Sequence, residues 1–172
     1  MVKSSDCDEI YCEAFGEDEA DFRNKLFESC FKYVCFLEDN GEILSMLFKL
    51  PCKIITNEEK LNAGYIYAAA TPIKHRSKGY MSLLLENVKQ SHNGVLFLRP
   101  ANEGLIDFYK KNGFKTITGI CNKNGFPLVE PIENFAKLTQ NIKDENNEEF
   151  TLMYYCEKDI NLENLHFIYS ME

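Results

Sequence analysis

Residues 64–90 contain the feature that most limits how this chain can fold, because a strand-like segment, a basic turn and an amphipathic helix follow one another directly. The segment 64–71 consists of small and aromatic residues without a charge, and Pro72 ends it, which predicts an interior strand. In 79–90 the apolar residues repeat with helical spacing, at Met81, Leu84, Leu85 and Val88. The sequence therefore predicts a strand that enters a helix through a short basic turn.

The turn itself carries three cations and ends on a glycine. Lys74, Arg76 and Lys78 alternate along it, and Gly79 stands where the helix begins. The first N–H groups of a helix have no partner within the helix and carry partial positive charge. Together with the three cations they predict a site for a phosphate group, which Gly79 would allow to approach the backbone. A solvated basic turn is the alternative interpretation of this segment taken alone.

Three consecutive alanines, 68–70, give the predicted strand an unusual composition. Alanine has a weak preference for strands, so such a run needs a reason. One reason is that a bulky ligand lies against the strand, and the other is tight packing of a helix on the sheet. With regular alternation, Tyr65, Tyr67, Ala69 and Thr71 share one face.

Length and charge limit the class of protein. A chain of 172 residues predicts one domain that spans residues 1–172. Its net charge of −8 argues against bulk electrostatic binding to nucleic acid, which needs a basic face. No apolar run approaches the length of about 20 residues that a membrane-spanning helix needs. We therefore expect neither a nucleic-acid partner nor a membrane partner.

The seven cysteines are scattered and form no CxxC motif, and the chain has only three histidines. A structural zinc site is therefore not expected. Most of the cysteines stand among apolar residues, as Cys35 does between Val34 and Phe36, which favours small core side chains in a reducing environment. The sequence therefore predicts a cytoplasmic protein without a metal.

Periodicity and turn residues predict the remaining elements. They are two helices within 6–31, separated at Gly16; an antiparallel hairpin of 33–37 and 43–50 around Asp39-Asn40-Gly41, stopped by Pro51; a buried strand at 94–98; a helix at 103–112 with Gly113 after it; strands at 114–120 and 150–156 that pair as a hairpin; a helix from Pro131 to about residue 142; and a strand or a helix in 160–172.

Residues 95–114 add a second pattern, in which a strand is followed by Pro100, Asn102, the pair Phe108-Tyr109 and the pair Gly113-Phe114. With these residues, and with Arg76-Ser77-Lys78-Gly79-Tyr80-Met81 in the basic turn, the sequence resembles the GCN5-related N-acetyltransferase (GNAT) superfamily. That family has a Q/R-x-x-G-x-G/A motif in the turn, and Met81 departs from it at the last position. The resemblance extends over roughly residues 43 to 117.

The resemblance implies a mixed α/β fold, in which a central mixed sheet is flanked by helices. The parallel strands at 64–71 and 94–99 splay apart, and acetyl-CoA, the co-substrate, lies in the opening. The resemblance further implies which residues contact acetyl-CoA: on the strand Ala69, Ala70 and Thr71, beside the pantetheine arm; in the turn Arg76, Ser77, Lys78, Gly79, Tyr80 and Met81, around the pyrophosphate; and Asn102.

The implied activity is transfer of the acetyl group of acetyl-CoA directly to a primary amine. An alkyl ammonium group has a pKa of about 10.4 and must lose a proton before it attacks the thioester. A backbone N–H near Thr71 is a candidate donor to the negative oxygen that develops. The family places a tyrosine at the position of Tyr109 to protonate the leaving thiolate. Alternatively, Tyr109 is only a core aromatic residue beside Phe108.

The sequence leaves the general base and the acceptor open. Candidates for the base are a water held by strand carbonyls, His75 or Glu103, although both side chains also suit surface positions. Arg99 could meet a carboxylate of the substrate or could simply be exposed at the end of a strand. The acceptor is expected to be a small-molecule or peptide amine. The alternative to an enzyme is a non-catalytic acyl-CoA-binding sensor or regulatory domain.

Overall fold

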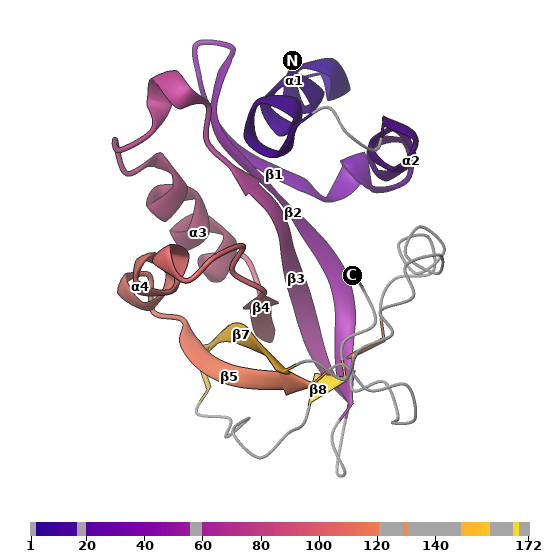
Figure 1. Cartoon of the computed structure of the whole chain (residues 1–172), viewed down its shortest axis with the longest axis vertical. Helices are drawn as coiled ribbons and strands as arrows, with labels where there is room; N and C mark the ends of the chain where they lie inside the picture. The colour runs from indigo at the N-terminus through magenta and orange to yellow at the C-terminus, as the bar shows by residue number, and fades with distance from the viewer. Residues whose placement is uncertain are drawn as a thin grey trace. The chain divides into compact units, whose positions relative to one another are not determined.

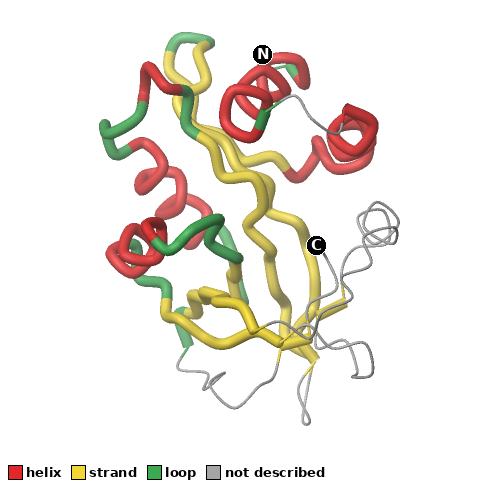
Figure 2. The backbone as a smooth tube through the Cα atoms, viewed as in Figure 1, coloured by secondary structure: helices red, strands yellow, loops and turns green. Residues whose placement is uncertain are grey.

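The computed structural model describes residues 3–16, 20–55, 60–120, 129–130, 149–158 and 167–168. The chain divides into two compact units, of which one comprises Met1–Leu50 and Ile66–Ser91 and the other comprises Pro51–Tyr65 and His92–Glu172. The fold is mixed α/β, as the sequence predicts, with helices and a mixed sheet (Figure 1; Figure 2). In the described ranges every helix is too short or too polar to be a membrane-spanning segment.

The first unit begins with two helices, α1 (Ser4–Phe15) and α2 (Ala20–Cys30), in the region where the sequence predicts two helices. Gly16 ends α1 with a φ of +90°, a left-handed value that glycine adopts without strain. Each helix buries one narrow face, which consists of Cys7, Ile10 and Tyr11 in α1 and of Leu26, Phe27 and Cys30 in α2. An ion pair of 2.9 Å between Arg23 and Asp8 links the two helices.

A hairpin follows, after the short 3-10 turn η1 (Phe31–Tyr33). Strand β1 (Val34–Asp39) pairs antiparallel with β2 (Glu42–Ile55), with Val34 opposite Phe48 and Asp39 opposite Glu42. The turn between them has positive φ at Asn40 (+49°) and Gly41 (+84°), which confirms the turn predicted there.

Aromatic rings join the helices of the first unit to this sheet. Tyr11 of α1 meets Phe27 of α2 edge-on, with ring centroids 5.8 Å apart. Phe27 in turn meets Phe48 of β2 at 5.4 Å, also edge-on. In Figure 1, α1 and α2 lie on one side of the strands and α3 (Tyr80–Gln90) lies on the other, where its apolar face buries Leu84, Leu85 and Val88.

The prediction that Pro51 stops the second strand of the hairpin is wrong, because β2 continues to Ile55. Proline lacks the N–H that a sheet needs and is tolerated where one side of a strand has no partner. Among the described residues, β2 pairs with β1 only as far as Phe48, and with β6 (Val129–Glu130) only at Lys53 and Ile54. Pro51 therefore falls in the interval between these two partners.

The second unit holds the other strands of the mixed sheet. They are β3 (Lys60–Ala70), whose first residues belong to this unit, β4 (Val95–Leu98), β5 (Lys115–Ile120), β7 (Glu149–Cys156) and β8 (Phe167–Ile168). The order of neighbours is β3-β4-β7-β5-β8. The predicted hairpin of 114–120 with 150–156 is confirmed, because β5 and β7 pair antiparallel with Thr116 opposite Met153.

Strands β3 and β4 form the parallel pair that the resemblance implies. Ala63, Gly64 and Tyr65 stand opposite Val95, Leu96 and Phe97. All four residues of β4 are buried, as expected for a strand covered on both faces. Helix α4 (Gly104–Lys111) follows β4 and ends before Gly113, whose φ is +84°. The helix predicted at 131–142, Cys121 and most of 160–172 lie outside the described residues.

Candidate functional site

The basic turn lies in the first unit and runs from Thr71 to Gly79, between β3 and α3 (Figure 1). It contains a short 3-10 helix, η2 (Ile73–His75). Beyond η2 the φ angle is positive at Ser77 (+61°) and at Gly79 (+81°), and Lys78 lies between them. Backbone that alternates in this way turns successive N–H groups toward one concave side, which suits an anion. All four residues from Arg76 to Gly79 are exposed.

The backbone angle at position 79, and not the packing around it, explains why a glycine stands there. A Cβ built on Gly79 would meet no atom within 4 Å, so the space beside it is open. The first backbone hydrogen bond of α3 runs from the Leu83 N–H to the Gly79 carbonyl at 3.0 Å. The N–H groups of Tyr80 and Met81 precede that bond, and the first turn of α3 contains no acidic residue. This end of α3 can therefore receive phosphate oxygens.

The alanine strand is kinked where the sequence predicts regular alternation. Ala68 has a φ of +48°, a left-handed value that costs a non-glycine residue on the order of 1–2 kcal/mol. The predicted sharing of one face by Tyr65, Tyr67, Ala69 and Thr71 is therefore interrupted at Ala68. Strain of this size in the middle of a strand often marks a functional segment.

Ala69 is half-buried and Ala70 is buried, so the strand presents little side chain here. Thr71, directly after the strand, is fixed by two contacts within the first unit. Its Oγ1 lies 2.7 Å from the Oγ of Ser45, a fully buried serine on β2 that sequence reasoning missed. Its carbonyl accepts a 3.0 Å hydrogen bond from the Nε of Arg76, so Thr71 and Arg76 are brought together as members of the predicted site.

The early part of the turn is held by carboxylates. Glu13 of α1 accepts the N–H of Ile73 with both oxygens at 3.3 Å. Glu42, at the start of β2, forms an ion pair with Lys74 and lies 3.0 Å from the Nε2 of His75. The Lys74 ammonium group, followed by the His75 imidazole, holds the pKa of the Glu42 carboxyl below its ordinary value. Lys74 is therefore directed at Glu42, which was not foreseen from the sequence.

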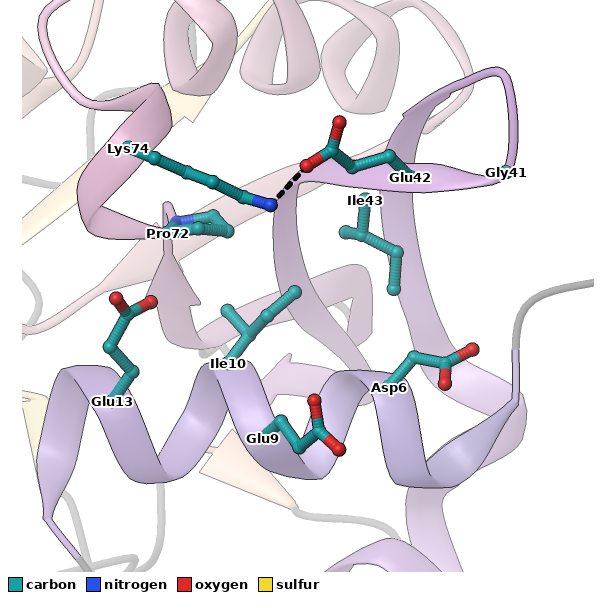
Figure 3. A pocket seen from close by; sticks show the side chains of 9 residues that line it. All are labelled: Asp6, Glu9, Ile10, Glu13, Gly41, Glu42, Ile43, Pro72 and Lys74. Carbon is teal, nitrogen blue, oxygen red and sulfur yellow. Dashed lines mark ion pairs between the residues drawn. The ribbon is translucent and has the colours of Figure 1, made fainter.

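A cavity of about 420 Å³ opens between α1, the β1–β2 turn and the basic turn, all in the first unit (Figure 3). Ile10, Ile43 and Pro72 supply its apolar wall. Its charged lining consists of Asp6, Glu9, Glu13, Glu42 and Lys74. Figure 3 shows Lys74 reaching across the cavity to Glu42. The spacing of Asp6, Glu9 and Glu13 on one helical face is the signal by which the sequence could have indicated this lining.

Tyr109 and Asn102 lie in the second unit. Tyr109 is buried in α4, with its ring 5.2 Å from that of Phe108 and 5.8 Å from that of Phe114. Burial raises the pKa of the Tyr109 phenol to about 12, so the hydroxyl keeps its proton at neutral pH. Asn102 is exposed ahead of α4, and its carbonyl accepts the N–H of Leu105 at 3.1 Å.

The candidates for a base have different surroundings. His75 is not the exposed side chain that its place in a turn suggests, because only 11% of it is accessible and its ring meets that of Tyr80 edge-on at 5.8 Å. Glu103 is the exposed N-cap of α4. Arg99 is exposed directly after β4.

The family model of an acetyltransferase (GNAT) domain matches residues 3–117, which is more than half of the chain. The chain belongs to the GNAT family. No curated protein is significantly similar to it in sequence.

Solved structures share the fold of this GNAT chain. An aminoglycoside 6′-N-acetyltransferase complexed with coenzyme A superimposes with a TM-score of 0.58 at 11% identity, covering 88% of this chain and 89% of that one. A histone acetyltransferase HPA2 and related acetyltransferase from Corynebacterium glutamicum gives a TM-score of 0.56 at 15% identity, covering 94% and 96%.

A GCN5-related N-acetyltransferase from Kribbella flavida gives a TM-score of 0.56 at 15% identity. The match covers 67% of this chain but 32% of that one, so the matched part of this chain spans about a third of the length of that relative. At these identities the likenesses establish the fold.

Proposed function

We propose that this chain is an N-acetyltransferase that moves the acetyl group of acetyl-CoA directly to a primary amine while both are bound. The observation that carries the proposal is the exposed basic turn with left-handed backbone at Ser77 and Gly79, immediately ahead of α3. Membership of the GNAT family supports acetyl transfer as the chemistry.

The residues present fit acetyl-CoA. The open space at Gly79 leaves room for a pyrophosphate against the backbone of Arg76, Ser77, Lys78, Gly79, Tyr80 and Met81. Ala69 and Ala70 carry small side chains, and Ala69 and Thr71 are half-buried, so we assign the backbone of this segment to the pantetheine arm. We assign Asn102 to the cofactor as well, on the resemblance alone. No role for a metal is proposed.

The chain supplies two polar groups for the reaction. The N–H near Thr71 is assigned to the thioester oxygen, where negative charge develops as the amine attacks. The Tyr109 hydroxyl is assigned to the departing thiolate on the resemblance to the family. Burial raises its pKa to about 12, so the phenol is protonated at neutral pH and is a weaker acid than an ordinary tyrosine. The proton of the attacking ammonium group goes to a base that we leave open between a strand-held water, His75 and Glu103.

The acceptor is a small-molecule or peptide amine. One structural neighbour is named as an aminoglycoside acetyltransferase, and an aminoglycoside-like amine is accordingly one class to test. We place the protein in the cytoplasm. The cysteines of the described ranges are free thiols, which suits a reducing environment.

The alternative function is an acyl-CoA-binding sensor that catalyses nothing. It is favoured by one observation, namely that β3 carries no carboxylate from Lys60 to Ala70 to serve as a base. A sensor needs the phosphate-binding turn but neither the Tyr109 hydroxyl nor an amine pocket.

Two measurements test the proposal. Acetyl-CoA at a hundred times its Kd should stabilise the protein by about 2.7 kcal/mol. For a chain of this size that is about 5–10 °C in Tm, with or without EDTA. A panel of polyamines, amino acids, aminoglycosides and peptide N-termini is then assayed for thiol release from acetyl-CoA. No Tm shift at millimolar acetyl-CoA would contradict the cofactor assignment, whereas a shift without thiol release for any acceptor would favour the sensor.

A further inference from the structure

The turn between β3 and α3 has two halves with different surroundings. Residues 71–75 make hydrogen bonds or ion pairs with Ser45, Glu13 and Glu42 of the first unit, although Ile73 and Lys74 are themselves exposed. All four residues from Arg76 to Gly79 are exposed. The left-handed residues that suit a phosphate lie in the exposed half. A segment that is exposed and strained keeps its shape only if the residues before it are fixed. The contacts of the first half therefore bear on how well the second half binds.

Glu42 fixes the first half from the side of the hairpin. One of its carboxylate oxygens, Oε1, contacts both Lys74 and the Nε2 of His75. The His75 ring lies between this carboxylate and the ring of Tyr80, the first residue of α3. Glu42 thus links the hairpin turn to the start of α3 through one nearly buried side chain.

The direction of the Lys74 side chain shows which part of the turn its ion pair with Glu42 affects. Its ammonium group crosses the cavity toward Glu42 (Figure 3), and Lys74 belongs to η2. The cations in the exposed half are Arg76 and Lys78, and Arg76 also bonds the carbonyl of Thr71. The ion pair therefore holds the backbone of η2 rather than adding a charge to the exposed half.

We propose that Glu42 is a positioning residue for the phosphates of acetyl-CoA: it raises affinity by holding Lys74 and His75, and thereby the shape of 76–79, without touching the cofactor. The proposal rests on the proposed function and names a residue of that same site. Simple electrostatics predicts the opposite sign, because a carboxylate near a phosphate weakens binding. Competition between Glu42 and the phosphates for Lys74 would likewise predict that loss of Glu42 strengthens acetyl-CoA binding.

The test compares two neutralised carboxylates of the same cavity. Glu42→Gln removes the charge that holds Lys74 and His75. Glu9→Gln, the matched control, removes an exposed charge that lines the same cavity and that forms no hydrogen bond or ion pair with the turn in the described residues. Acetyl-CoA affinity is measured by calorimetry. Binding of acetyl-pantetheine, which lacks the pyrophosphate, is followed by NMR titration.

We expect Glu42→Gln to weaken acetyl-CoA binding by about two- to fivefold, with acetyl-pantetheine unaffected. Glu9→Gln should leave acetyl-CoA binding unchanged or slightly strengthen it. A Glu42→Gln protein that binds acetyl-CoA as well as the parent, or more tightly, overturns the positioning role. Equal losses for acetyl-CoA and acetyl-pantetheine also overturn it, because they indicate general damage.

The measurements on the parent protein separate failure of the role of Glu42 from failure of the proposed function. If the parent protein itself does not bind acetyl-CoA, the proposed function fails and the role of Glu42 fails with it. If the parent binds and only the comparison of variants fails, the proposed function stands. If Glu42→Gln does not fold, His75→Gln takes its place, and unchanged acetyl-CoA affinity in that variant overturns the proposal equally.

Discussion

Two helices of this protein start in the same way in the sequence and differently in the structure. Both α3 and α4 follow a strand and a short turn with a proline near its beginning. Before α3 the backbone is left-handed at Ser77 and Gly79, and the first helical bond is donated by Leu83, the fourth residue of the helix. Before α4 the N-cap Glu103 already has helical angles of −59° and −33°.

The difference extends to charge and hydrogen bonding. In α4 the N–H groups of Leu105 and Ile106, its second and third residues, already donate to Asn102 and Glu103 at 3.1 Å. Its first turn carries Asp107, whereas that of α3 carries no acid. The start of α3 is therefore suited to an anion and the start of α4 is not. In the second unit, α4 carries a buried phenol, Tyr109, to which we assign proton donation.

The largest expected effect is at Gly79. Gly79→Glu places a side chain and a negative charge in the open space beside the turn, at a φ of +81° that disfavours any side chain. We expect acetyl-CoA binding to weaken by more than about a hundredfold, since charge, bulk and backbone strain act together. Calorimetry measures the loss, and Tm reports whether the fold is kept.

Gly16→Glu is the control for Gly79→Glu. Gly16 has a φ of +90° and a ψ of 175°, a combination almost confined to glycine, and has no atom within 4 Å of a built Cβ, so its replacement costs at least as much backbone strain away from the turn. It should lower Tm at least as much as Gly79→Glu does and leave acetyl-CoA binding intact. Normal binding by Gly79→Glu would show that the phosphate site has been assigned to the wrong turn.

Tyr109→Phe tests the contribution of α4. The change removes only the hydroxyl, so packing against Phe108 and Phe114 stays. General acid catalysis typically contributes about 10²–10⁴-fold, and we expect a loss in kcat of about 10²-fold because water can partly replace the phenol. Acetyl-CoA binding should be nearly unchanged.

Tyr154→Phe is the matched control, since Tyr154 is also buried in the second unit and has no assigned role. Steady-state thiol release with an identified acceptor provides the measurement. An unchanged kcat in Tyr109→Phe, with acetyl transfer shown to limit the rate, would return Tyr109 to a purely structural role. A parallel loss of binding would instead mean that the hydroxyl contacts the cofactor.

The same burial predicts how stability depends on pH. Burial raises the pKa of Tyr109 and that of the Cys52 thiol to about 12 each. Unfolded cysteine and tyrosine have ordinary pKa values of about 8.5 and 10. Between the unfolded and the folded pKa, each group keeps in the folded chain a proton that the unfolded chain has released. The contribution of each group to stability is therefore complete below its unfolded pKa and is lost as the pH rises from that value toward about 12.

Each group lowers the free energy of unfolding by about 1.4 kcal/mol per pH unit in its interval. Urea titrations at a series of pH values measure the slope. Cys52→Ala should flatten it from about pH 8.5 upward, and Tyr109→Phe only above about pH 10. A Cys52→Ala slope identical to that of the parent would contradict burial of a protonated thiol at this position.

Local sequence rules predicted much of the fold. Apolar spacing located α1, α2, α3 and α4, and turn residues located the β1–β2 hairpin and Gly113. They did so because these features depend on residues a few positions apart. The extension of β2 through Pro51 was missed, because tolerance of proline depends on which strands flank it. The kink at Ala68 was missed because alanine gives no local signal for a positive φ.

The candidate site, like the fold, was predicted only where it depends on residues close together in the sequence. The basic turn and Gly79 were visible in the sequence because the residues that form the turn are consecutive. The contacts that fix it come from Ser45, Glu13 and Glu42, which are far from it in the chain. No periodicity links a hairpin residue to a turn more than 25 residues later. Contacts of this kind follow from the tertiary fold and could not be predicted from spacing.

The smallest expected effect comes from giving the first turn of α3 an acidic residue, as the first turn of α4 has. Leu83 occupies in α3 the position that Asp107 occupies in α4, and its side chain is 50% exposed, so the fold should tolerate a change. Leu83→Asp brings a carboxylate to the first turn of α3. At a separation of about 8 Å in water, one such charge opposes each phosphate charge by about 0.5 kcal/mol. For a doubly charged pyrophosphate we expect about fivefold weaker acetyl-CoA binding at low salt.

The loss of affinity in Leu83→Asp should shrink as salt screens the charges, and Leu83→Asn should show none of it. Calorimetry of the three proteins at two salt concentrations measures both effects. Equal affinities of Leu83→Asp and Leu83→Asn at low salt would mean that the phosphates do not bind at the start of α3, and the contrast between the two helices would lose its functional meaning.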